Sequence, residues 1–159
     1  MKIKGHGVWD HIRLLAPLFG VIAVVWALRM GLAAVACPRT VWYYISISVV
    51  VPICIALAVF LIHIRRFGGY ANVVLASLLL VVWSQLLIVT AIAFSALTGI
   101  ETVYDMPEFT FGMNTPWKHI AGSLTFGVGM GTLFGAAMGC LLLWMLRKMP
   151  ADTAQVKRP

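Results

Sequence analysis

The sequence contains few charged residues. They make up 11% of its 159 positions, whereas hydrophobic residues make up 62%. A chain of this size needs more polar surface than that to remain dissolved as a globule. The composition therefore excludes a soluble globular protein and predicts an integral membrane protein.

Acidic residues are the scarcest charged type, with five Asp and Glu in the whole chain. None of them lies within the long apolar segments, where ion-coupled transporters place their carboxylates. The same segments hold no cluster of acid, base and nucleophile. We therefore expect a protein that is neither a self-sufficient ion transporter nor an enzyme, and we expect no cofactor.

Cysteine is also rare, and the three cysteines are predicted to lie at different depths in the membrane. Cys37, Cys54 and Cys140 are therefore not expected to form a disulfide. No metal-ligand spacing links them to a histidine. The small residues before Cys37 are typical of a signal-peptidase site, but the length of the preceding apolar segment favours a retained span.

Four apolar segments are each long enough to cross a bilayer, which takes about 20 residues. The predicted fold is thus an all-α integral membrane protein, a bundle of four transmembrane helices. Residues 1–149 form one membrane domain and residues 150–159 a disordered basic tail. The predicted spans are residues 14–36, 41–64, 72–98 and 120–146, with an outer loop at 99–119.

Basic residues gather at one set of span ends, and this pattern predicts the orientation. Lys and Arg near the ends of spans stay on the cytoplasmic side, so both termini are predicted to be cytoplasmic. The net charge of +7 favours anionic lipid headgroups as neighbours and not nucleic acid. The pattern fits a bacterial inner membrane. The expected headgroup contacts are Arg65, Arg66, Arg147 and Lys148.

A stripe of small residues follows one side of the fourth span. It consists of Ser123, Gly127, Gly131, Gly135 and Gly139, and is called the glycine stripe below. Such a stripe lets another helix approach closely inside a membrane.

Three partners for the glycine stripe remain open. The favoured one is the first span, which carries a matching set at Ala23, Ala27 and Gly31. The others are a surface on another copy or a different protein, and a glycine-lined pore built from several copies.

Arg29 is the one charge inside a span, and such a charge is by default a functional hypothesis. It lies close enough to the outer end to reach water, or to pair with Glu101, Asp105 or Glu108 of the outer loop. A functional role would be to hold an anion or a quinone carbonyl. The loop itself is interpreted as a lid over the bundle or as a docking surface.

The third span carries several polar side chains, with Gln85 at its centre and Ser77 and Ser84 nearby. Hydrogen bonds between helices are the expected use of these groups, and a polar pathway for a solute is the alternative. His11 and His63 are weak candidates for haem or quinone binding, because both are predicted at the membrane boundary.

Together these features favour a small non-enzymatic membrane protein. We expect an accessory, assembly or stabilising subunit that contacts a protein partner, or another copy of itself, through the fourth span. A homo-oligomeric channel or small-solute carrier is the alternative, and a haem- or quinone-binding subunit is a second one.

Overall fold

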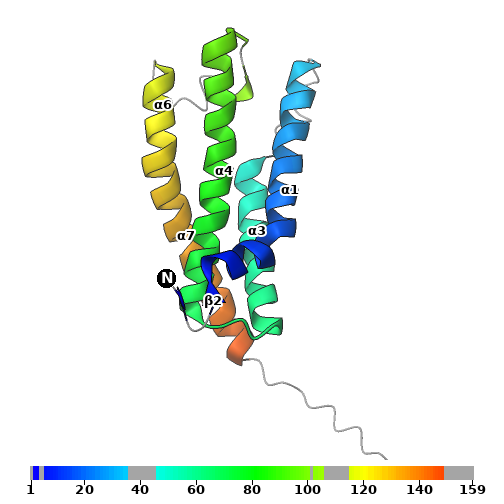
Figure 1. Ribbon diagram of the computed structural model, residues 1–159, viewed down its shortest axis with the longest axis vertical. Helices are drawn as coiled ribbons and strands as arrows, with labels where there is room; N and C mark the ends of the chain where they lie inside the picture. The colour runs from blue at the N-terminus through cyan, green and yellow to red at the C-terminus, as the bar shows by residue number, and fades with distance from the viewer. Residues whose placement is uncertain (1, 4–5, 36–45, 101, 106–114, 149–159) are drawn as a thin grey trace, which may run out of the picture.

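The computed structural model describes residues 2–3, 6–35, 46–100, 102–105 and 115–148. Apart from two short strands at its start, the described part of the chain forms a helical bundle (Figure 1). Its four helical rods are long and apolar enough to cross a membrane, which confirms the predicted class. They are α1 (Val8–Ala34), α3 (Ile47–Ile64), α4 (Tyr70–Thr98) and the continuous series α6 (Pro116–Gly122), η2 (Ser123–Gly127) and α7 (Val128–Lys148).

All four spans begin at residues other than those the sequence predicted, and α4 starts at Tyr70 instead of residue 72. The first starts at Val8 instead of residue 14, and the Asp10 carboxylate accepts a hydrogen bond from Gly7 N at 2.7 Å in its first turn. The last starts at Pro116 instead of residue 120, since proline suits the first helical position. The helix α3 starts at Ile47, after Ser46 caps it. Residues 41–45 and the basic tail lie outside the described residues.

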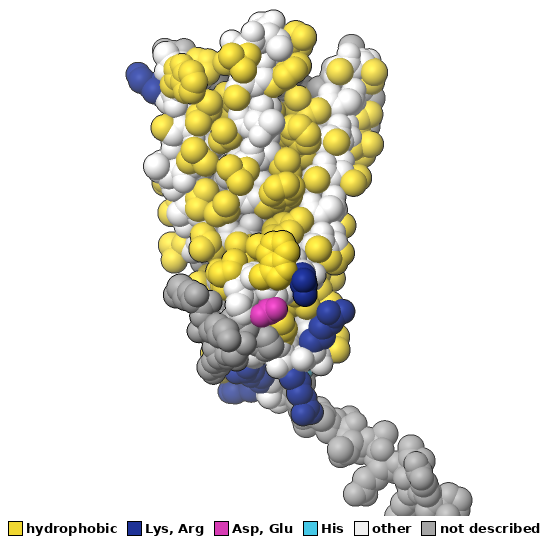
Figure 2. Space-filling view, viewed as in Figure 1, with side chains coloured by type: hydrophobic (Ala, Val, Ile, Leu, Met, Phe, Trp, Pro, Cys, Tyr) yellow, Lys and Arg dark blue, Asp and Glu magenta, His cyan; other side chains and the backbone are white. Residues whose placement is uncertain are grey.

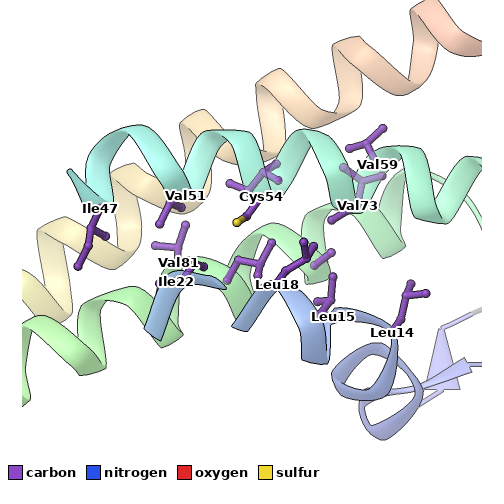
Figure 3. Close-up of a cluster of buried hydrophobic side chains, with 14 of the residues drawn as sticks. Leu14, Leu15, Leu18, Ile22, Ile47, Val51, Cys54, Val59, Val73 and Val81 are labelled. Carbon is purple, nitrogen blue, oxygen red and sulfur yellow. The ribbon is translucent and has the colours of Figure 1, made fainter. Parts of the chain in front are cut away.

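The helix α4 occupies the middle of the bundle, with α1 on one side and the α6–α7 rod on the other (Figure 1). It packs against every other span. The shorter α3 covers one part of the bundle, packing against α1, α4 and α7. The buried apolar side chains of these helices meet in one cluster (Figure 3), which includes Leu15, Ile22, Val59 and Val73.

The start of α1, the turn between α3 and α4 and the end of α7 lie at the same end of the bundle (Figure 1). Most of the visible Lys and Arg side chains gather there (Figure 2). Two short strands, β1 (Lys2–Ile3) and β2 (His6–Gly7), pair antiparallel just before α1.

The turn between α3 and α4 is a tight hairpin. Arg66, which follows the end of α3, lies in the left-handed region with a φ of 49°. Gly68 has a φ of 145°, and a Cβ there would collide with the Asn72 side chain. This second position therefore requires glycine. Gly69 is the N-cap of α4.

Candidate functional site

The glycine stripe lies against α4 and α3, inside the bundle. A Cβ at Gly131 would stand 2.9 Å from Val81 Cγ1, and one at Gly139 would stand 2.7 Å from Val73 Cγ1. At Gly135 it would stand 2.6 Å from Ile55 Cδ1. These distances are shorter than ordinary van der Waals contact, so the absence of side chains is what allows α7 to approach so closely.

The favoured partner of the stripe was therefore wrong. The central α4 separates α1 from the α6–α7 rod (Figure 1), so the small residues of the two spans do not face each other. Within α1, Ala27 is exposed, and a Cβ added at Gly31 would meet no described atom within 4 Å. The stripe glycines that α4 and α3 cover cannot line a pore either.

A cavity of about 280 Å³ lies between α3, α4 and α7. Two stripe glycines form part of its wall, and most of the remaining wall is aliphatic. Exposed side chains at its edge, among them Phe134 at 67% exposure, show that it opens to the side of the bundle. Its residues are Ile47, Ser48, Val51, Pro52, Ile55, Val81, Ser84, Gln85, Ile88, Gly131, Phe134, Gly135 and Met138.

The polar groups of α4 are not used as expected. Ser84 Oγ donates a hydrogen bond to Val81 O of its own helix at 2.8 Å, and the buried Ser77 hydroxyl has no partner among the described residues. The Gln85 amide, which lines the cavity, forms no hydrogen bond to another described group. It packs against Gly127, where a Cβ would stand 2.9 Å from the amide oxygen. The expected interhelical bonds from these three residues are therefore not observed.

Arg29 is buried, at 3% exposure, beneath the first described part of the outer loop. Its guanidinium carbon lies 5.3 Å from the centre of the Tyr104 ring, which is a cation–π distance. Burial raises the pKa of Tyr104 to about 12, and the positive charge of Arg29 acts in the opposite direction. Thr102 and Tyr104 are buried, as a lid requires, whereas Glu101 and Glu108 lie outside the described residues.

His11 takes part in a buried polar network between α1 and α4. Its Nδ1 lies 2.8 Å from Gly7 O and its Nε2 lies 3.1 Å from Asn72 Oδ1. The Asn72 amide nitrogen in turn donates a hydrogen bond to Phe67 O at 3.2 Å. His11 is fully buried and each of its ring nitrogens faces an oxygen atom at hydrogen-bond distance, so neither nitrogen faces a space that could hold a haem.

His63 lines a different cavity, at the basic end of the bundle. This cavity has a volume of about 330 Å³ and includes Arg66 and Arg147 in its wall. The Arg147 guanidinium donates a hydrogen bond to Gly68 O at 3.1 Å and lies over the Tyr70 ring, 5.0 Å from its centre. Two cationic side chains in the wall of one cavity suit an anionic group. The arrangement does not support a haem held jointly by His11 and His63.

Two structural contacts were missed in the sequence. They are the contact of Asn72 with His11 and the contact of Trp83 with α1. The Trp83 indole donates a hydrogen bond to Phe19 O of α1 at 3.1 Å. Both residues join α4 to α1, and no sequence signal links positions more than 60 residues apart when each is an isolated polar group in an apolar helix.

Among the described residues, no group of three His, Cys, Asp or Glu side chains could hold a metal ion. Cys54 is buried and Cys140 is partly buried, and both are free thiols, while Cys37 lies outside the described residues. In comparisons with protein-family models, curated proteins and solved structures, nothing matches this chain.

Proposed function

We propose that this protein is a small non-enzymatic membrane subunit that assembles with, or stabilises, another membrane protein. Its docking surface is the outward face of the fourth span, opposite the glycine stripe. The sequence directed attention to the stripe itself, but α4 and α3 already cover that side of the helix.

The observation that carries this proposal is the small buried share of the last span. Within its most apolar window 17% of the residues are buried inside the chain, against 28–39% for the other three spans. In the last span, the side with the glycine stripe packs inside the bundle. The opposite face carries large apolar side chains. These include Phe126, Leu133, Leu141 and Trp144, with exposures of 47–71%.

A ridge of large side chains suits helix packing in a membrane, where van der Waals contact drives association. The π-helical turn η2 interrupts this span between Ser123 and Gly127. Such turns re-aim the side chains that follow and are frequent at functional positions. The glycine face and the ridge therefore play different roles in the proposal, the first holding α7 in the bundle and the second contacting the partner.

The proposed orientation places the basic end of the bundle in the cytoplasm of a bacterial cell. Arg13, Arg65, Arg66, Arg147 and Lys148 support it, because all of them belong to the start of α1, the α3–α4 turn or the end of α7. The cavity beside His63, Arg66 and Arg147 is the proposed contact for an anionic lipid headgroup.

Site-specific photo-crosslinking in native membranes tests the docking surface. A photoreactive amino acid at Leu133 or Leu141 is expected to yield a discrete crosslinked protein. The matched controls are Val24 of α1 and Leu57 of α3, which are also exposed and apolar, at 65% and 47%. Crosslinks to lipid alone from all four positions would contradict the proposed docking surface.

A further inference from the structure

The cavity between α3, α4 and α7 has features of a ligand site that the subunit proposal does not use. It is apolar, open to the side and carries a few polar groups, as sites for small molecules commonly do. None of the described residues in its wall is charged. A charged ligand would have no counterion there, so the ligand that fits is neutral.

The Gln85 side chain determines which kind of ligand the cavity favours. It lies near the middle of α4, which runs from Tyr70 to Thr98, and its amide has no hydrogen-bond partner among the described residues. Inside a bilayer there is little water to satisfy such a group, and an unpaired amide is costly. A ligand that accepts a hydrogen bond from this amide therefore gains affinity that a saturated hydrocarbon does not.

A second polar group belongs to the opposite wall. Pro52 lies within α3 and has no N–H, so it leaves the Ser48 carbonyl without its usual helical donor. Both residues line the cavity and are exposed at its edge. The side opening thus has a hydrogen-bonding group on α4 and another on α3.

The depth of Gln85 in the membrane limits which membrane molecules can reach this cavity. Ester carbonyls of phospholipids lie near the headgroups, roughly 15 Å from the bilayer centre, because the hydrocarbon core is about 30 Å thick. Gln85 lies too near the centre of its span for those carbonyls to reach it in their normal position. Molecules that dissolve entirely in the hydrocarbon region, such as isoprenoid quinones, bring a carbonyl to that depth.

The size of the cavity agrees with one ring. A volume of about 280 Å³ is at the lower limit of ordinary ligand pockets, so it accommodates a head group while a hydrocarbon tail leaves through the side opening. Phe134 offers an aromatic face at the edge and Met138 an adaptable thioether.

We infer that this cavity binds the ring of a neutral, lipid-soluble carbonyl compound of the quinone class, with the Gln85 amide donating a hydrogen bond to a ring carbonyl. This site is distinct from His11, His63 and Arg29, which the sequence suggested for a quinone.

The test uses the full-length protein in lipid nanodiscs and a short-tailed benzoquinone that carries a diazirine. After photolysis, labelling is expected in the cavity segments, residues 81–88 and 131–138. An excess of the unlabelled benzoquinone should compete, and a saturated hydrocarbon with the same tail should not. Gln85→Leu is expected to reduce labelling about tenfold, the equivalent of one hydrogen bond.

The matched control is Thr90→Val, a polar-to-apolar change elsewhere on α4. Thr90 is exposed, donates a hydrogen bond to Leu86 O of its own helix and does not line the cavity. The Thr90→Val variant should therefore be labelled as strongly as the wild type. A thermal-unfolding scan separates binding from folding, since benzoquinone should stabilise the wild type and Thr90→Val but not Gln85→Leu. Equal labelling of Gln85→Leu and wild type, or equal competition by the hydrocarbon, would overturn the inference.

Discussion

Replacing Gly139 with alanine is expected to destabilise the bundle, because three branched side chains surround this glycine. An added Cβ would stand 2.7 Å from Val73 Cγ1, 3.3 Å from Val59 Cγ2 and 3.5 Å from Ile55 Cγ2. All three neighbours are at most 2% exposed, and β-branched side chains have little rotational freedom. An extra carbon in a packed core costs about 1–3 kcal/mol.

Gly129 provides a matched control in the same helix. It is exposed, and a Cβ there would meet nothing within 4 Å. Alanine is the better helix former at both positions, by about 1 kcal/mol in water, so this gain cancels when the two variants are compared. We therefore expect Gly139→Ala to be less stable than Gly129→Ala by about 1–3 kcal/mol.

The assay is reversible unfolding of both variants in one detergent, followed by a rescue. Truncating the nearest neighbour in the double variant Gly139→Ala/Val73→Ala removes the atom that the new Cβ would meet, so the two changes should cost less together than the sum of their separate costs. Equal stability of Gly139→Ala and Gly129→Ala would refute the packing of the glycine stripe on α4 and α3. Strict additivity of the double variant would refute the assigned neighbour.

Three further predictions concern polar groups. Trp83→Phe should lower the free energy of unfolding by about 0.5–1.5 kcal/mol, because it removes the hydrogen bond to the α1 backbone. Trp26→Phe should lower it less, because the Trp26 indole nitrogen has no partner among the described residues. Unfolding of both variants in detergent measures the difference. Asn72→Leu should lower the free energy of unfolding by about 1–3 kcal/mol, because it removes the buried polar contact with His11 and the hydrogen bond that Asn72 donates to Phe67 O. A double-mutant cycle with His11→Leu should show less than additive loss. Burial raises the pKa of Tyr104 from 10 to about 12, so folding opposes ionisation of this side chain. The free energy of unfolding should therefore fall between pH 10 and 12, and it should fall less steeply in Tyr104→Phe. Unfolding measured across that pH range tests this.

The membrane class and the four spans could be predicted from the sequence because length and hydropathy alone decide them. Helix ends were less predictable. The helices that start at Val8 and Pro116 begin outside the apolar segments, where hydropathy carries no signal and local features such as Pro116 and the Gly7–Asp10 hydrogen bond decide the boundary.

The partner of the glycine stripe could not be predicted, because small residues indicate that a helix comes close without indicating which one. The decisive fact is the position of α4 between α1 and α7, a property of the whole bundle. The same applies to Gln85. Its polarity was evident, but its place in the wall of a cavity depends on the course of α3 and α7 around it.

The most direct test of the subunit proposal is the mass and composition of the intact particle, purified with a tag from its native membrane in mild detergent. The chain itself is 17.4 kDa. The proposal predicts a larger particle that contains at least one unrelated membrane protein in fixed stoichiometry. A particle made only of this chain, as one copy or several, would contradict it, and a homo-oligomer would favour the channel or carrier alternative.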